Sequence, residues 1–202
     1  HKKKVLVIDF DPQGNASTGL GLGVCDRIHS TYGVMLGDSE INESIFQTKV
    51  QGLFLIPAIV DLSAAEIELS DIDDREFILK NKIENIIDDF DYIIIDCPPS
   101  LGLLTVNALS ATKHILIPMQ CEFYSLEGLS HLLTTLDLIK KNLNPDLNIL
   151  GIILTMHDKR NKLTEQVEED VRRFLGDLVF KSSIPRNVRL SEAPSYGEVA
   201  LT

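Results

Sequence analysis

The sequence predicts an α/β fold built around a doubly wound, mainly parallel sheet. Short apolar runs alternate with longer amphipathic stretches along the chain. The runs are apolar throughout and do not alternate with polar residues, which is typical of strands covered by helices on both faces. Strands that alternate with helices imply right-handed crossover connections, and therefore parallel strand pairs.

Four apolar runs are the expected strands: 5–8, 92–95, 114–117 and 149–154. Three amphipathic stretches have the apolar spacing of a helix and are expected to cover the sheet: 77–87, 126–143 and 163–175. The sequence shows no internal repeat, no low-complexity tract and no Pro/Gly-rich linker. We therefore expect a single domain over residues 1–202.

The composition is that of an ordinary globular protein, 44% hydrophobic and 24% charged. No apolar run approaches the roughly 20 residues that span a bilayer, so we expect no membrane association. No secretory signal precedes the first strand, and the three cysteines are widely spaced, as in reduced intracellular proteins. These features together predict a cytoplasmic protein.

The net charge of −11 argues against a protein that coats nucleic acid by bulk attraction. Residues 156–190 depart from this average, because they hold eight Lys/Arg against six Asp/Glu. Such a cluster can be a solvated helix face or a nucleic-acid interface. Composition leaves both interpretations open.

Two expected strands stop at an aspartate. Asp9 opens the segment DFDPQGN, and Asp96 opens DCPPSLG. Ligands of doubly wound sheets bind beyond the carboxyl ends of the strands, where a carboxylate can hold a magnesium-bound water or orient a nucleophile. An aspartate there can also cap a helix. Two of them, each followed by a loop shaped by Pro and Gly, favour a functional site with switch-like loops.

Other candidate motifs give weaker signals. The run GLGLG at 19–23 lacks the last glycine of the dinucleotide-binding spacing and begins ten residues after Asp9, so we interpret it as a loop. Cys97 follows Asp96 and is expected to be a buried thiol and not a nucleophile. The five histidines show no metal-ligand spacing.

Longer blocks of sequence resemble ParA/Soj-type chromosome-partitioning ATPases of the MinD/ParA superfamily, which carry a deviant Walker A motif. The resemblance runs from about residue 3 to 197. Its blocks are DFDPQGNASTGLG at 9–21, LSAAEIEL at 62–69, DYIIIDCPPSLGLLTVNAL at 91–109, PMQCEFYSLEGLSHLL at 118–133, LTMHD at 154–158 and IPRNVRLSEAPS at 184–195.

The resemblance implies a P-loop NTPase fold that binds ATP and Mg²⁺ as cofactors. It also implies an ATP-dependent homodimer that binds DNA without sequence preference at the nucleoid. A ParB/Spo0J-type partner protein would stimulate hydrolysis. These properties are expectations from the family and do not follow from composition or spacing.

The resemblance also assigns roles to individual residues near the strand ends. Asp11 corresponds to the catalytic residue that positions the attacking water. Asp96 corresponds to the Walker B aspartate, which reaches magnesium through a water, and Asp9 lies near the same magnesium shell. The stretch from Pro98 to Gly102 corresponds to the second switch.

Two further sets of residues are implied by the resemblance in the second half of the chain. Residues expected near the adenine base are Thr155, Met156, Pro185 and Arg186. Residues expected to bind DNA are Arg160 and Arg189.

The sequence departs from the family in one important respect. Members begin with a strand and a KGGxGK[S/T] loop, whereas no G-x-x-x-x-G-K-[S/T] occurs in these 202 residues. We therefore expect a shortened fold without its first strand and P-loop, the loop whose N–H groups and lysine hold the phosphates. Two functions stay open: an ATP-driven partitioning switch, or a truncated, non-catalytic binding module that keeps the fold. A membrane-cycling MinD-like ATPase would need a terminal amphipathic helix, which is not visible.

Overall fold

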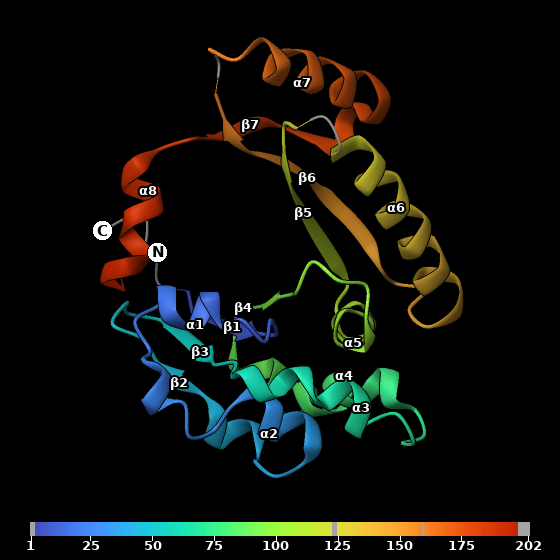
Figure 1. Cartoon of the computed structure of the whole chain (residues 1–202). Coiled ribbons are helices and arrows are strands. Elements are labelled where there is room, and N and C mark those ends of the chain that lie inside the picture. The colour runs from blue at the N-terminus through green and yellow to red at the C-terminus, as the bar shows by residue number, and fades with distance from the viewer. Residues whose placement is uncertain (1–2, 123–124, 159, 198–202) are drawn as a thin grey trace. The chain divides into compact units, whose positions relative to one another are not determined.

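The computed structural model describes residues 3–122, 125–158 and 160–197 (Figure 1). The chain divides into two compact units, each described by itself below. Unit 1 comprises residues 1–111 and 189–202, and unit 2 comprises residues 112–188. The single domain expected over 1–202 stays a prediction. The sequence block at 118–133 includes residues 123 and 124, which lie outside the described residues.

Unit 1 contains a four-stranded sheet in the order β2-β3-β1-β4. Its strands are β1 (Val5–Asp9), β2 (Phe46–Gln47), β3 (Leu53–Ile56) and β4 (Tyr92–Asp96). Strand β1 is parallel to both β3 and β4, and only the short β2 is antiparallel to its neighbour. The first strand of the chain therefore lies inside the sheet, so its end is flanked by the ends of two others.

Helices of unit 1 bury one face of this sheet. Leu6, Ile8 and Phe10 are fully buried and belong to one apolar cluster with side chains of the surrounding helices. The helices that contribute to this cluster are α2 (Thr31–Leu36), α3 (Ala65–Glu68), α4 (Ile78–Ile83) and α5 (Leu103–Ala111). The other helices are α1 (Asn15–Gly19) and α8 (Val188–Glu192), which begins at the last residue of unit 2. This packing fixes β1 and hence the loop that follows it.

Unit 2 contains a three-stranded parallel sheet in the order β5-β6-β7. The strands are β5 (His114–Gln120), β6 (Asn148–His157) and β7 (Val179–Pro185), connected through α6 (Ser125–Asn142) and α7 (Lys162–Leu175). Ile152 and Leu154 of β6 are fully buried at its centre. Among the described helices of the chain, none is long and apolar enough to cross a membrane.

The α/β class with mainly parallel strands is confirmed, and all four expected strands are present. The hydrogen bonds divide these strands between two sheets, so the single doubly wound sheet stays a prediction. The helix expected over 77–87 is wrong in length, because α4 ends at Ile83 and 3-10 turns flank it. Acidic residues at 84, 88 and 89 oppose the negative end of a longer helix dipole.

Candidate functional site

Asp9 and Asp96 end two neighbouring parallel strands and are paired in register. The backbone N–H of Phe10 donates to the carbonyl oxygen of Asp96 at 2.8 Å, which extends the pairing one step past β1. Residues in register on adjacent strands face the same side of a sheet. Asp9 and Asp96 therefore end side by side at the carboxyl edge of this sheet.

The Asp9 side chain is fully buried and hydrogen-bonded on both oxygens. Its Oδ2 accepts the backbone N–H of Ser17 at 2.7 Å and the Ser17 hydroxyl at 2.5 Å. Its Oδ1 accepts the N–H of Asp11 at 3.3 Å, while the Ser17 Oγ also accepts the N–H of Ala58 at 3.0 Å. Asp9 thus fixes the loop between β1 and α1, because a buried carboxylate is stable only with such partners.

Asp11 lies in the turn that follows and remains partly exposed. Its carboxylate accepts the N–H of Gln13 at 3.0 Å, and its carbonyl oxygen accepts the N–H of Gly14 at 2.9 Å. Gly14 has φ 63°, a left-handed conformation that glycine adopts without steric cost. The turn therefore holds the Asp11 carboxylate close to the end of β1.

The three carboxylates influence one another. The pKa of Asp96 is raised by partial burial, and further by the negative charges of Asp9 and Asp11. Burial, followed by Asp96 and Asp11, raises the pKa of the Cys97 thiol to about 12, which leaves it protonated at neutral pH. In the part of the chain that the structure describes, no Lys or Arg forms an ion pair with any of these aspartates. Carboxylate oxygens are the ligand type that Mg²⁺ prefers, and it commonly takes only one or two of them from the protein. Among the described residues, no three His, Cys, Asp or Glu side chains are grouped closely enough to hold a metal ion without further ligands.

The loop after Asp96 is held at its far end. The Thr105 hydroxyl donates to the carbonyl oxygen of Ser100 at 2.5 Å, and the N–H of Leu104 donates to the Glu66 carboxylate at 3.3 Å. Glu66 belongs to the block LSAAEIEL, to which the sequence analysis gave no role. Its contact could not be found from sequence, because 38 positions separate it from Leu104.

In unit 2, the residues expected near a nucleotide base lie together at the ends of β6 and β7. Thr155 and Met156 precede His157, which is paired in register with Pro185. The N–H of Arg186 donates to the carbonyl oxygen of His157 at 3.0 Å. Met156 has φ 51°, which is uncommon for a residue with a side chain and marks a constrained strand end.

His157 is buried beneath this strand end and was not singled out by sequence. Its Nε2 lies 2.6 Å from Glu168 Oε2, and Arg172 Nε donates to the other Glu168 oxygen at 2.8 Å. Arg172 also donates to the carbonyl oxygen of Phe180 at 3.0 Å, so the three side chains join β6, α7 and β7. Burial acts to raise the pKa of Glu168, but the hydrogen bonds from Arg172 and His157 outweigh it and lower this pKa.

The two arginines expected to bind DNA lie in different units. The Arg160 side chain is 90% exposed. Its Nε and Nη2 atoms donate hydrogen bonds to the two Asp158 carboxylate oxygens at 2.9 and 2.8 Å. This contact holds the pKa of Asp158 far below its usual range. Arg189 lies on α8 in unit 1 and is exposed. Their location on one surface therefore stays a prediction.

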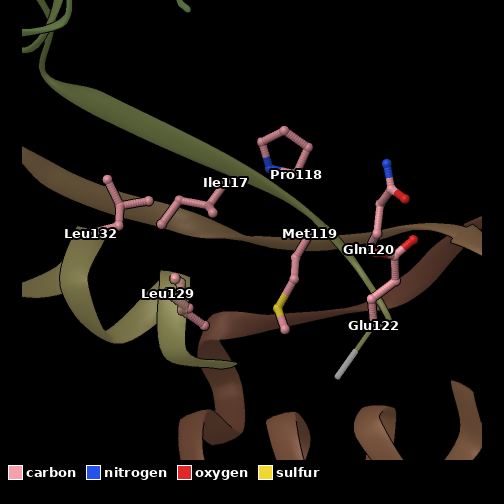
Figure 2. Close-up of a pocket in the computed structure, with 8 residues that line it drawn as sticks. Ile117, Pro118, Met119, Gln120, Glu122, Leu129 and Leu132 are labelled. Atoms are coloured by element: carbon pink, nitrogen blue, oxygen red, sulfur yellow. The ribbon is translucent and has the colours of Figure 1, made fainter. Parts of the chain in front are cut away.

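A pocket of about 380 Å³ lies between β5 and the first half of α6 (Figure 2). Figure 2 shows Leu129 and Leu132 on one side of it, Gln120 and Glu122 on the other, and Met119 between them. The lining residues described for it include no Lys or Arg, and none of the residues expected to bind nucleotide or DNA. This chemistry does not suit a phosphate group.

Solved structures place this fold among the P-loop NTPases of the ParA/MinD type. Cobyrinic acid a,c-diamide synthase from Mycobacterium smegmatis, with bound ATP analogue and magnesium, is 37% identical with a TM-score of 0.85, over 96% of this chain and 79% of that one. The Cyanothece McdA–ATP complex has a TM-score of 0.87 at 23% identity, over 98% of this chain and 78% of that one, and shows the fold alone.

Sequence comparisons define the family. The model described as an AAA domain matches residues 1–149. The sporulation initiation inhibitor protein Soj of Bacillus subtilis is 52% identical over 97% of this chain and 78% of its own length. The chromosome partitioning protein ParA of Myxococcus xanthus is 49% identical over 98% of this chain and 70% of its own length. The chain belongs to the ParA/Soj family of chromosome-partitioning ATPases.

Proposed function

We propose that this protein is an ATP-dependent switch for partitioning chromosomes or plasmids. ATP and Mg²⁺ would drive formation of a homodimer, the dimer would bind DNA without sequence preference at the nucleoid in the cytoplasm, and a ParB/Spo0J-type partner would stimulate hydrolysis. The observation that carries the proposal is the register of Asp9 and Asp96, with Asp11 in the next turn. This is the carboxyl edge where parallel sheets bind phosphate ligands.

The three aspartates differ in burial, and this difference suggests their roles. Asp96 is exposed and has a raised pKa, which suits a group that binds a magnesium-held water. Asp11 is partly exposed in a tight turn and would orient the water that attacks the terminal phosphate. Buried Asp9 would hold the loop that carries Asp11 in position, next to the magnesium ion and its bound waters. Magnesium, when bound, would neutralise charge that develops on the phosphates.

The ends of β6 and β7 support a base-binding role in unit 2. The exposed Met156 is available for apolar contact with a base, and backbone groups next to it are fixed by the Arg186–His157 hydrogen bond. Thr155 donates its hydroxyl to the carbonyl oxygen of Met119 at 3.4 Å, which holds that side chain against β5. Thr155, Met156, Pro185 and Arg186 would therefore form a preformed edge for adenine.

The DNA-binding part of the proposal depends on local positive charge. At a net charge of −11, the whole chain repels DNA, so affinity must come from groups such as Arg160 and Arg189. Two copies of such a weak patch in a dimer would bind far more tightly than one. This is the physical reason to couple DNA binding to ATP-dependent dimerisation.

The alternative to this switch is a non-catalytic binding module with the same fold. The 202 residues contain no G-x-x-x-x-G-K-[S/T] motif. Without its backbone N–H groups and lysine, a triphosphate placed beside Asp9, Asp11 and Asp96 meets mainly negative charge. Binding of ATP by these residues alone would then be weak.

Calorimetry with ATP and Mg²⁺ distinguishes the two candidates. We would compare the 202-residue chain with a form that carries a KGGxGKT loop and its strand ahead of residue 1, called here the loop-bearing form. The partitioning switch predicts micromolar binding and phosphate release by the loop-bearing form, and neither by the 202 residues alone. If the loop-bearing form unfolds cooperatively but neither binds ATP nor releases phosphate, the binding module is the remaining candidate.

A further inference from the structure

The loop from Cys97 to Gly102 connects Asp96 to helix α5, and its two ends are held by different elements. At one end, the carbonyl oxygen of Asp96 accepts the N–H of Phe10. At the other end, Glu66 Oε1 accepts the N–H of Leu104 in the first turn of α5. A carboxylate at a helix N-terminus satisfies a free N–H group and interacts favourably with the helix dipole.

Gly102 gives independent evidence that Glu66 occupies this position. A Cβ atom built on Gly102 would overlap the Glu66 carboxyl, with Cδ at 2.9 Å and Oε2 at 3.0 Å, and the three atoms nearest to that Cβ all belong to Glu66. Gly102 has no left-handed φ, so its backbone suits any residue. A side chain at 102 would therefore displace the Glu66 carboxylate, whereas the turn itself would accept one.

Helix α5 is held to neighbouring elements by its own contacts, independently of the loop. Asn107 is fully buried in its middle. Its Oδ1 accepts the N–H of Leu79 at 3.1 Å, and its Nδ2 donates to the carbonyl oxygen of Arg75 at 2.8 Å. Helix α3, which carries Glu66, is anchored through the fully buried Ala65. Glu66 thus links helices α3 and α5 at the point where the loop ends and α5 begins.

We propose that Glu66 is a positioning residue that fixes the far end of the Asp96 loop and confines its rearrangement to residues 97–101. The consequence for ATP hydrolysis rests on the proposed function, since this loop corresponds to the second switch of the family. The position of the loop itself does not depend on that function. It can therefore be tested in the 202-residue chain.

The first test is a double-mutant cycle between Gly102→Ala and Glu66→Ala, followed by thermal unfolding. Gly102→Ala should lower the midpoint by roughly 2–4 °C, because the new methyl group displaces Glu66. In the Glu66→Ala background the same change should cost nothing measurable, because the space is empty. An undiminished cost of Gly102→Ala in that background would overturn the proposal.

The second test measures loop opening through the half-buried thiol of Cys97, in a Cys25→Ser background that removes the exposed thiol. Labelling at Cys97 by a thiol reagent, located by mass spectrometry, should accelerate roughly five- to tenfold in Glu66→Ala, which corresponds to loss of one capping interaction. Glu66→Gln should label at close to the parent rate, because its amide oxygen can still accept the Leu104 N–H. The matched control is Glu68→Ala, since Glu68 lies on the same helix but accepts from the Tyr32 hydroxyl.

The urea dependence of the Cys97 labelling rate shows whether Glu66→Ala opens only the loop or destabilises the whole fold. Opening of a short loop exposes little surface, so the accelerated rate should hardly change with urea below the unfolding transition. A rate that rises steeply with urea, or an equal acceleration in Glu68→Ala, would contradict the proposal. In the loop-bearing form, Glu66→Ala should lower phosphate release at saturating ATP. If the parent form releases none, the proposed function fails while the Cys97 result still decides the role of Glu66.

Discussion

Ser17 holds Asp9 with two hydrogen bonds, one from its backbone N–H at 2.7 Å and one from its hydroxyl at 2.5 Å. Neither residue is exposed to solvent. These hydrogen bonds stabilise the buried Asp9 carboxylate, and they also fix the loop that carries Asp11. The predictions below follow from this and from the other fixed contacts of the site.

Replacing Ser17 with Ala should destabilise unit 1 by about 1–3 kcal/mol. The change removes one hydrogen bond to Asp9 and leaves the buried N–H of Ala58 without its acceptor. Urea unfolding of the 202-residue chain measures this loss. Ser63→Ala is the matched control, because the Ser63 hydroxyl is exposed and bonds only locally to Val60. An equal, small effect of both changes would mean that Ser17 does not support Asp9.

Asp96→Asn should stabilise the metal-free protein at pH 7. The pKa of Asp96 is raised in the folded state, so folding disfavours its charged form. The free energy of unfolding therefore falls as the pH rises from the ordinary aspartate pKa through the raised value. The gain should reach at most roughly 1 kcal/mol after allowance for solvent screening, and vanish below the ordinary aspartate pKa. Unfolding measured from pH 3 to 8 tests this. Millimolar Mg²⁺ should stabilise the parent chain more than Asp96→Asn, and the reverse order would argue against a magnesium site.

Glu168→Gln should destabilise unit 2 at neutral pH by roughly 1–2 kcal/mol, because it removes the charge shared by His157 and Arg172. The folded-state pKa of Glu168 is lowered, so its contribution is present above the ordinary glutamate pKa and is lost as pH falls through the lowered value. Unfolding midpoints of the two proteins should therefore converge in acid. Glu169→Gln, on the exposed side of α7, serves as the control and should show no such pH dependence.

Arg160→Ala and Arg189→Ala should each weaken duplex DNA binding by the ATP-bound dimer about equally for all sequences. Each should also reduce the slope of log affinity against log salt by about one, because one phosphate contact is lost. Fluorescence anisotropy at several salt concentrations measures both quantities. Arg173→Ala is a suitable control, since Arg173 is exposed and paired with Asp170. Unchanged slopes in both variants would assign these arginines to an ordinary solvated surface.

Two strands of unit 1 and the edge where they end could be predicted, because the sequence patterns that indicate them are local. Apolar runs located β1 and β4, and the aspartate that ends each run located the edge where Asp9 and Asp96 meet. The difference in burial between them could not be predicted. Asp9 ends the interior strand β1 and is bonded by Ser17, eight positions away, whereas Asp96 ends β4, the last strand in that sheet. Nothing in the sequence distinguishes a buried strand-end aspartate from an exposed one.

The contacts that sequence analysis missed are long-range. Glu66 reaches Leu104, and Asn107 reaches Leu79, only because helices far apart in the sequence pack together. His157 resembled an isolated histidine, since its carboxylate partner is on the next helix. Strand β2 is only two residues long and has no apolar run. Strand β3 (Leu53–Ile56) is an apolar run like the four expected strands, and the sequence analysis missed it.

The central claim is that Asp11 orients the attacking water at a magnesium site formed beside Asp96. The most direct test is phosphate release by the loop-bearing form and by its Asp11→Ala variant, with ATP affinity measured in parallel. Exposed Asp38, which follows α2, provides the control variant Asp38→Ala. The account predicts unchanged ATP affinity and a loss of hydrolysis in Asp11→Ala alone, because that residue positions water and does not hold the phosphates. Parental turnover in Asp11→Ala would contradict it.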